Sequence, residues 1–331
     1  FRNMMSHETP FTKRLGIKYP IICGAMYPCS NPELVATVSE AGGLGIVQPL
    51  SMVYVHGHEL RQGLRLIKSM TSKPFGVNII VEKSSKLYEK RMQSWVDVCL
   101  EEGCRFFITS LGNPKWVVDK AKSVGGLVYH DVTSRNWAEK ALETGDEGLI
   151  CVNNRAGGHA GTKDAEELYH ELSSLGAPLI CAGGIGDEND FLRVMHLGYA
   201  GVQMGTRFIA SLECHEKKDY KDAIVAANEQ DVVLTERVTG IPLSVIKTPY
   251  VEKIGTKVGP IARFLLQHRW TKHWMRMWYN IIAVRNFKRI SLHGGSSKDY
   301  WQAGKSVHGI HAIESAAEIV KRFGKAWEES R

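Results

Sequence analysis

The sequence predicts an α/β protein built as a (β/α)8 barrel, with an inserted, mostly helical segment near its C-terminus. Eight short apolar runs alternate with amphipathic stretches between Pro20 and Met204. Each run is too apolar to be half exposed, which is typical of parallel strands in a covered sheet, and eight strand–helix units are the number that closes a barrel. An open doubly wound sheet would instead carry a G-x-G-x-x-G turn after its first strand, and the turn that starts at Cys23 reads C-G-A-M-Y-P.

The elements follow one another in a regular order along the chain. Strands, as apolar runs bounded by polar or glycine-bearing turns, are expected at 20–26, 44–47, 75–81, 106–109, 127–132, 148–152, 178–182 and 201–204. Amphipathic helices are expected at 32–41, 53–70, 87–102, after the Asn113-Pro114 cap, and at 136–144, 164–175 and 188–197. The expected domains are a barrel at 11–239, a basic helical lid or insertion at 240–300, and a C-terminal helix at 301–331 that returns to the barrel.

The composition indicates a globular protein with reduced thiols. The 331 residues are 44% hydrophobic, which is enough for a full core. The seven cysteines are odd in number and form no C-x-x-C pair, so neither a disulfide framework nor a metal site is expected. No apolar run approaches the ~20 residues of a membrane span and no signal pattern is present, so a cytoplasmic protein is expected.

Functional side chains are expected where the strands end, because barrel enzymes carry their sites on that face. The sixth strand runs into Ala156-Gly157-Gly158-His159. Its small residues let the backbone approach a bulky group, and His159 is the side chain there that exchanges protons near neutral pH. The seventh and eighth strands end in Gly183-Gly184 and Gly205-Thr206, whose bare backbone N–H groups suit a phosphate. The alternative is that these glycines only turn the chain tightly and that the histidine is solvated.

A set of short motifs also carries a resemblance to a known family. The motifs are F-T-K-R-L-G from Phe11, Y-P-I-I-C-G-A-M from Tyr19, A-G-G-L-G from Ala41, P-F-G-V-N from Pro74, A-G-G-H-A-G from Ala156, A-G-G-I from Ala182, M-G-T-R-F from Met204 and W-Q-A-G from Trp301. Together they resemble the nitronate monooxygenase (2-nitropropane dioxygenase) family. That family consists of FMN-dependent TIM barrels, and its close relatives include NADH:quinone reductases and FMN-dependent enoyl-ACP reductases.

The resemblance implies FMN as the cofactor and assigns its contacts residue by residue. The isoalloxazine would be lined by Ala25, Met26 and Asn78, the close-approach wall formed by Ala156, Gly157 and Gly158, and the ribityl phosphate held by Gly183, Gly184, Gly205 and Thr206. His159 would face the flavin as the catalytic residue, and Ala303-Gly304 would fold back toward the mouth. Asp131 and Lys305 depart from the family pattern, which has Lys in several relatives at the first position and Gln or Met at the second. Neither residue therefore belongs to the expected site.

The activity implied by the resemblance is oxidation of alkyl nitronates, of the propionate 3-nitronate and 2-nitropropane type, by O2 to a carbonyl compound and nitrite. A nitronate is already a carbanion equivalent, so His159 need only hold it over the flavin. The alternative is a reductase in which NAD(P)H reduces the flavin and a quinone or an enoyl-ACP removes the hydride. A third class, a flavin or lipid binder without catalysis, is opposed by the intact phosphate turns and His159. The expected partners are a small-molecule substrate and O2, and a homodimer is compatible with the sequence.

The segment between Lys253 and Lys298 carries ten of the chain's 42 Lys and Arg residues and none of its 35 acidic residues. A helix is expected from Ile261 to about Phe287, with Trp270, Trp274 and Trp278 on one face at intervals of four. We expect a lid whose aromatic stripe packs on the barrel mouth. The alternative is peripheral contact of 261–289 with an anionic membrane. Nucleic acid is not an expected partner, since no DNA- or RNA-binding module accompanies the charge.

Overall fold

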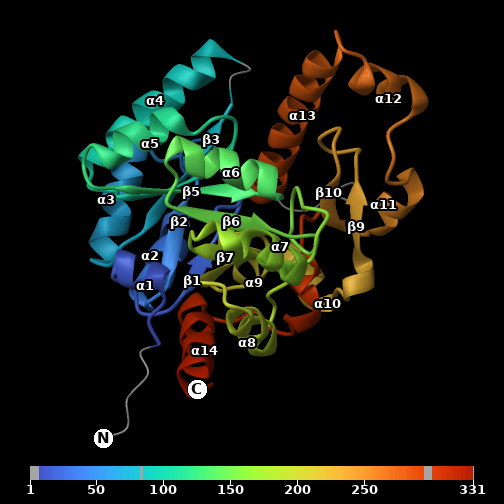
Figure 1. The fold of residues 1–331 in the computed structure, drawn as a ribbon. Coiled ribbons are helices and arrows are strands. Elements are labelled where there is room, and N and C mark those ends of the chain that lie inside the picture. Colours follow the sequence, from blue (N-terminus) through green and yellow to red (C-terminus); the bar gives the residue numbers. More distant parts are fainter. Residues whose placement is uncertain (1–6, 83–84, 294–299, 331) are drawn as a thin grey trace, which may run out of the picture.

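Eight parallel strands close into a barrel in the computed structural model, which describes residues 7–82, 85–293 and 300–330 (Figure 1). The strands are β1 (Ile21–Cys23), β2 (Leu44–Val47), β3 (Gly76–Val81), β4 (Phe106–Leu111), β5 (Leu127–Val132), β6 (Gly148–Val152), β7 (Leu179–Ala182) and β8 (Gly201–Met204). Each strand pairs with the next, and β8 pairs back with β1 through Ile21 opposite Val202. The predicted (β/α)8 fold is therefore confirmed.

The helices between the strands form the outer layer of the barrel. They are α2 (Pro32–Glu40), α3 (Leu60–Met70), α4 (Lys86–Glu101), α5 (Lys115–Lys122), α6 (Arg135–Thr144), α7 (Ala165–Leu172) and α8 (Glu188–Leu197). Capping boxes at Asp164 and Asp187 begin α7 and α8. The helix expected at 53–70 is divided into a single π-turn, Ser51–Val55, and α3. Gly57 between them has φ +72°, a conformation that interrupts a right-handed helix.

Apolar side chains fill the barrel interior and its amino-terminal end. Helix α1 (Pro10–Leu15) places Phe11 against the rings of Phe106 and Tyr129 at that end. The interior cluster also contains Ile22, Leu44, Ile46, Ile108, Ile150 and Ile180. All seven cysteines are buried free thiols. The packed interior leaves the carboxyl ends of the strands as the face on which polar residues gather.

Helix α14 (Ala316–Glu329) takes the place of an outer helix after β8. The helix that directly follows β8, α9 (Thr206–Ile209), is a single turn, whereas α14 packs against both α2 and α8. Trp327 is buried on α14, and its indole N–H donates to the carbonyl of His7 at 3.0 Å. The ring of Tyr19 lies against Gly324, where a Cβ would come within 2.4 Å. The C-terminal helix thus returns to the barrel.

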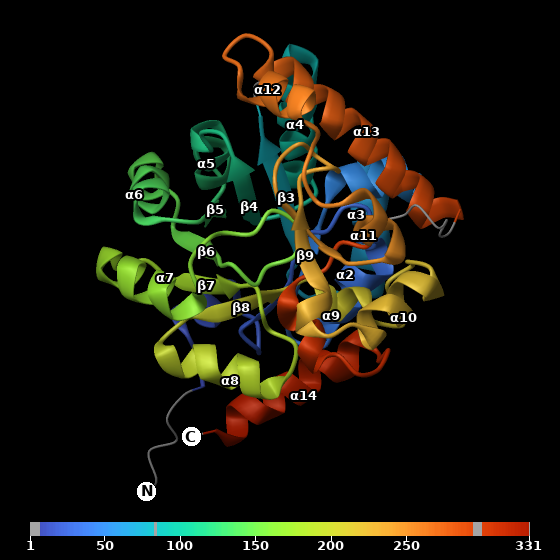
Figure 2. The ribbon, with the colours of Figure 1, turned by 90° about the vertical axis from the view of Figure 1, so that its right-hand side faces the viewer.

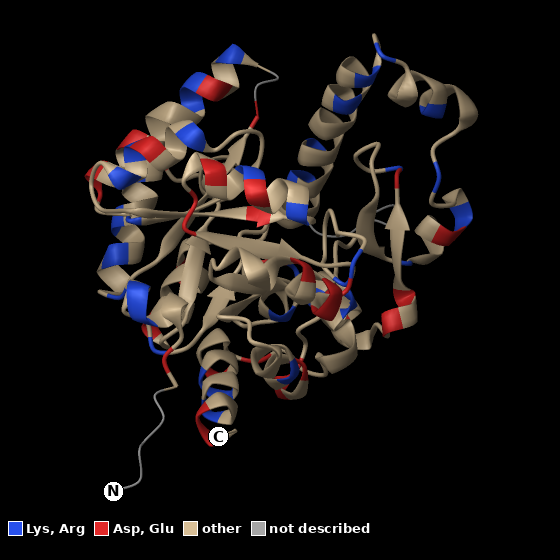
Figure 3. Cartoon of the chain, in the orientation of Figure 1, with Lys and Arg blue, Asp and Glu red and all other residues tan. Residues whose placement is uncertain are grey.

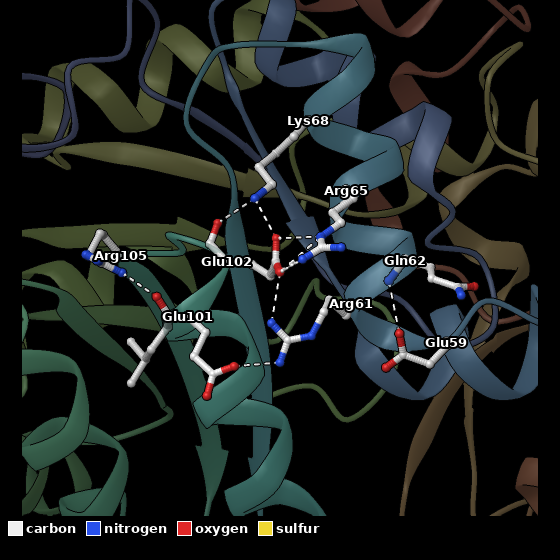
Figure 4. A network of polar contacts seen from close by, with 9 residues as sticks. Glu59, Arg61, Gln62, Arg65, Lys68, Glu101, Glu102 and Arg105 are labelled. Carbon is white, nitrogen blue, oxygen red and sulfur yellow. Dashed lines mark hydrogen bonds and ion pairs between the residues drawn. The ribbon is translucent and has the colours of Figure 1, made fainter.

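The outer layer is also linked by a cluster of charged residues around Glu102 (Figure 4). Its carboxylate accepts hydrogen bonds from Arg65, Lys68 and Arg61 of α3, with the Lys68 Nζ–Oε2 distance at 2.7 Å. These donors lower the pKa of Glu102 to about 2. The three cations tie α3 to the end of α4 on the outside of the barrel, away from the strand ends.

Residues 218–293 form a further group of elements beside the carboxyl ends of the strands, and buried side chains of this group belong to the main core cluster (Figure 2). The group consists of α10 (Lys218–Ala226), the antiparallel pair β9 (Val232–Thr235) and β10 (Leu243–Ile246), α11 (Pro249–Ile254), α12 (Pro260–Gln267) and α13 (Lys272–His293). None of the helices in the described part of the chain combines the length and the apolar character needed to cross a bilayer.

The structure corrects two expectations about the basic segment. The single helix expected from 261 to 287 is two helices, with a turn after His268. The expected burial of the tryptophan stripe on the barrel mouth is also wrong, because Trp270, Trp274 and Trp278 are 78%, 72% and 63% exposed. Helix α13 packs on the barrel through Ala283 and its buried neighbours instead. Ala283 follows Trp274 by nine positions, or about two and a half turns, and therefore lies on the opposite side of the helix.

Candidate active site

Asn153 organises the turn that follows β6. Its side chain is buried, its Nδ2 donates to the carbonyl of Gly183 at 2.9 Å, and its Oδ1 accepts from the backbone N–H of Arg155 at 2.9 Å. The backbone carbonyl of Asn153 also accepts from the N–H of Gly161. One residue thereby fixes both ends of the glycine turn and joins it to the turn after β7. The sequence places Asn153 at a strand end, but nothing in its local pattern reveals this bridging role.

The turns after β7 and β8 have the backbone shape of an anion cradle. Gly183 and Gly184 have φ +118° and +79°, which favour glycine. A Cβ on Gly183 would lie 2.3 Å from Asn153 Oδ1, so no side chain fits there. Within the described residues, the backbone N–H groups of Gly184 and Thr206 meet no protein acceptor. Such free amides at the carboxyl ends of strands fit a phosphate.

The return segment completes the wall beside these turns. The N–H of Gly304 donates to Thr206 Oγ1 at 2.9 Å, and a Cβ on Gly157 would lie 3.0 Å from Gly304 N. Lys305 N donates to the carbonyl of Arg155 at 2.9 Å, and the Arg155 guanidinium forms a two-pronged ion pair with Glu229. The structure therefore brings Gly157, Thr206 and Gly304 together, as the sequence predicts for the return of Ala303-Gly304.

A hydrogen bond to a backbone carbonyl fixes the imidazole of His159. Nδ1 lies 2.9 Å from the carbonyl oxygen of Pro242. A carbonyl can only accept, so Nδ1 carries the proton and Nε2 of the neutral ring has a free lone pair. Surrounding protein atoms partly desolvate the ring, which lowers the pKa of His159, and the Pro242 carbonyl opposes this change. The exposed His159 side chain can thus accept a proton at Nε2.

Strand β10 holds the histidine turn from the other side. The N–H of Ser244 donates to the carbonyl of Gly158 at 2.8 Å, and the carbonyl of Ser244 accepts from Ala303 N at 3.3 Å. Ile246 N donates to the carbonyl of Trp301 at 2.8 Å. β10 therefore lies between the glycine turn and the return segment. Two β-branched runs around Thr239-Gly240 are the sequence signal that could have predicted this hairpin.

The remaining predicted cofactor residues differ in how closely they join this group. The Met26 sulfur lies 3.3 Å from the position that a Cβ on Gly205 would take, so Met26 is next to the β8 turn. Ala25 packs against the interior cluster. Asn78 stands apart on β3, where its Nδ2 donates to the carbonyl of Ile108 at 3.2 Å. The structure gives no direct contact between Asn78 and the glycine turns.

Two polar side chains inside the barrel have buried oxygens without a hydrogen-bond partner in the described chain. They are Asp131 Oδ1 on β5 and Gln203 Oε1 on β8. Asp131 follows the interior residue Tyr129 by two positions, and Gln203 pairs with the interior residue Ile22, so both side chains face inward. Burial raises the pKa of Asp131 to about 7. Orphaned buried oxygens of this kind fit a site that receives a polar ligand.

Comparison with known proteins identifies the family. The family model described as nitronate monooxygenase matches residues 8–323. The chain belongs to this family. It is therefore an oxidoreductase, and the cofactor of the family is a flavin.

Relatives of the chain carry more than one name. A probable nitronate monooxygenase of Staphylococcus saprophyticus is 30% identical over 310 residues, which cover 81% of this chain and 86% of the relative. A (3aS,4S,5R,7aS)-5-hydroxy-7a-methyl-1-oxo-octahydro-1H-indene-4-carboxyl-CoA dehydrogenase of Rhodococcus jostii is 29% identical, covering 76% and 69%. The solved structure of FabK from Thermotoga maritima matches with a TM-score of 0.80 at 30% identity, covering 98% of this chain and 97% of that one. Membership of the family therefore leaves the substrate open.

Proposed function

We propose that this enzyme uses FMN to oxidise alkyl nitronates with O2, giving a carbonyl compound and nitrite. The observation that carries the proposal is the hydrogen bond from His159 Nδ1 to the Pro242 carbonyl, which leaves Nε2 available at the barrel mouth. Membership of the nitronate monooxygenase family and the relative in S. saprophyticus support the same reaction.

The flavin of the proposal is FMN, which carries a single phosphate. The backbone groups of Gly183-Gly184 and Gly205-Thr206 would hold one ribityl phosphate. Ala156, Gly157 and Gly158 would form the wall, with Ala25, Met26 and Asn78 along the ring edge. When bound, FMN would accept electrons from the substrate, and O2 would reoxidise the reduced flavin.

His159 would position the substrate and exchange its proton. Partial desolvation keeps the imidazole neutral near pH 7, since its pKa lies below the ordinary value. A nitronate anion placed beside Nε2 favours the protonated ring, which then donates a charge-assisted hydrogen bond to a nitronate oxygen. A neutral nitroalkane would instead lose its α-proton to Nε2. The carbonyl of Pro242 keeps the ring orientation in both cases, because it accepts from Nδ1 in either protonation state.

A second candidate function follows from the relative in R. jostii, whose name specifies a carboxyl-CoA substrate. In this alternative a nicotinamide supplies hydride and an unsaturated thioester or a quinone accepts it. The same His159 would then serve as the proton donor to the reduced substrate. The long match to FabK of T. maritima is compatible with this alternative.

Anaerobic reduction separates the two candidates. We expect an alkyl nitronate such as propionate 3-nitronate to bleach the bound flavin in a stopped-flow spectrometer without a nicotinamide. NADH should leave the flavin oxidised on the same time scale. If NADH bleaches the flavin at catalytic rates and the nitronate does not, the reductase alternative replaces the proposed function.

A further inference from the structure

Helices α12 and α13 and the turn between them carry large apolar side chains that no other part of the described chain covers. We call this surface the α12–α13 face; its exposed side chains are Ile261 and Phe264 on α12, Trp270 in the turn, and Trp274, Trp278 and Ile281 on α13. Trp274, Trp278 and Ile281 follow one another at intervals of four and three residues, which places them in one row along α13. Exposed patches with several large apolar side chains mark interaction sites on proteins in water.

The charge around this face has a single sign. All ten charged side chains between Lys253 and Lys298 are Lys or Arg. Figure 3 shows α12 and α13 with blue segments and no red ones. On α13, Arg285 and Lys288 lie about one and two turns beyond Ile281, on the side of the helix that carries the tryptophans. The face therefore combines indoles with cations and lacks any acidic group of its own.

The opposite side of α13 is attached to the barrel. Ala283, Phe287 and Ile290 are buried in the main core cluster. The hydroxyl of Tyr27 donates to the Val284 carbonyl at 3.3 Å, and Ser291 Oγ donates to Glu216 Oε1 at 2.6 Å. Tyr27 belongs to the turn after β1, so α13 is anchored beside the carboxyl ends of the strands. These contacts fix the rotation of α13 about its axis, so the side that carries the tryptophans faces away from the barrel.

The chemistry of the face selects among its potential occupants. A second copy meeting the same face across a twofold axis would bring two all-basic segments together, which costs free energy. A bilayer surface with anionic headgroups supplies the missing negative charge, and indoles favour the boundary between headgroups and acyl chains. Helices with an apolar side, flanking Lys or Arg and low overall hydrophobicity bind in the plane of such an interface.

We propose that the α12–α13 face docks the enzyme on the surface of an anionic lipid bilayer. Docking inserts the indoles of Trp270, Trp274 and Trp278 at headgroup depth and places Arg285 and Lys288 among the phosphates. Because α13 is anchored to the turn after β1, the carboxyl-terminal face of the barrel then lies near the lipid. The proposal does not depend on which substrate the enzyme oxidises.

Vesicle sedimentation tests the proposal with the flavin-loaded enzyme. The probes are vesicles of phosphatidylcholine alone and vesicles of phosphatidylcholine mixed with phosphatidylglycerol, each at low and high salt. We expect sedimentation with the anionic vesicles at low salt, release at high salt, and little sedimentation with phosphatidylcholine alone. The absence of binding to anionic vesicles overturns the proposal, as does a face that instead joins two copies of the enzyme in analytical ultracentrifugation.

Two sets of variants identify the face. Changing Arg285 and Lys288 to Gln should weaken partitioning about 30-fold, since two cations near the surface together contribute roughly one and a half decades. The double variant Trp274→Ala/Trp278→Ala should weaken it at least about tenfold while thermal stability stays unchanged. Trp137→Ala is the matched control, because Trp137 is 55% exposed on α6, outside the face. Equal binding by the Trp274/Trp278 variant and the Trp137 variant contradicts the proposal.

Discussion

At the scale of single residues, the orientation of the His159 ring depends on a partner 83 positions away in the sequence. The Pro242 carbonyl selects the tautomer, and Asn153 fixes the turn on which the histidine stands. The glycine motif points to the histidine and its neighbours, because small residues next to a proton-exchanging side chain form a local pattern, and their role in the site stays a prediction. It could not predict Pro242 or the bridging role of Asn153, since both depend on contacts between distant segments.

Replacing His159 by Ala removes the group that, in the proposed function, orients the substrate and exchanges its proton. We expect kcat/KM for propionate 3-nitronate to fall about 10²-fold or more, the usual cost of losing a positioned acid–base group. The flavin content should stay unchanged, because backbone groups of the proposed cradle would hold the phosphate. His170→Ala is the control, as His170 is an exposed histidine on α7 paired with Glu166. Steady-state rates with flavin content measured for each variant check the prediction, and equal rates for both would remove His159 from catalysis.

Asp146 carries a buried carboxyl group away from the active site. Its Oδ2 accepts from Thr144 Oγ1 at 3.1 Å, but its Oδ1 has no partner in the described chain, and burial raises its pKa from 3.8 to about 7. The folded state therefore binds this proton more tightly than the unfolded state does. The resulting stability is fully present below about pH 4 and is lost as the pH rises to about 7.

The substitution Asp146→Asn should abolish this part of the pH dependence. We expect the wild type to lose about 2 kcal/mol of unfolding free energy between about pH 5 and pH 8 relative to the variant. Urea titrations at the two pH values measure this difference. Asp119→Asn serves as the control, because Asp119 is exposed and pairs with Lys115. If the stabilities of the wild type and the Asp146→Asn variant change in parallel with pH, the carboxyl group stays ionised in the folded protein.

At the scale of elements, the eight barrel strands were easier to predict than the elements beside their carboxyl ends, namely the β9–β10 pair and helix α13. The eight apolar runs matched the barrel strands within a few residues, since burial on both faces leaves a mostly apolar pattern. The β9–β10 pair was not predicted, because the residues of β9 vary in burial and the two strands pair across a loop of seven positions. The lid expectation failed because the aromatic spacing of α13 identifies a face of the helix without saying which side that face contacts.

Gly184, in the turn after β7, can be tested against Gly176, which precedes β7 and has a similar backbone conformation. Gly184 and Gly176 have φ +79° and +75°, so Asp at either position meets similar backbone strain. Gly176 has open space around it, whereas a Cβ at Gly184 lies 2.9 Å from Arg155 Nε in the proposed cradle. Gly184→Asp should reduce bound flavin at least about tenfold through repulsion of the phosphate, and Gly176→Asp should retain it.

Absorbance and mass spectrometry of the heat-released ligand provide the measurement for this pair. The wild type should release FMN. Release of FAD would refute the single-phosphate cradle, and equal flavin in the two Asp variants would place the phosphate elsewhere in the barrel.

At the scale of the whole molecule, the barrel depends on a segment that lies more than 100 residues beyond its last strand. Helix α14 packs against α2 and α8, and the residues just before it pass the active site at Gly304. The sequence predicted that this helix returns to the barrel from the W-Q-A-G motif, but its docking between two outer helices is a tertiary contact with no local signal. The insertion thus separates β8 from α14 in the sequence, but α14 still completes the outer layer of helices around the barrel.

Trp327→Ala tests whether α14 belongs to the cooperative unit of the barrel. Trp327 is 1% exposed, lies against Phe191 of α8 and donates its indole N–H to His7. Its removal leaves a cavity, and we expect a loss of about 3–5 kcal/mol in the free energy of unfolding. Trp137→Ala, at an exposed position on α6, should change that free energy by no more than about 0.5 kcal/mol. Urea unfolding followed by both circular dichroism and flavin release should give one shifted transition for the Trp327 variant. A separate early transition that leaves the flavin bound would mean that α14 folds independently of the barrel.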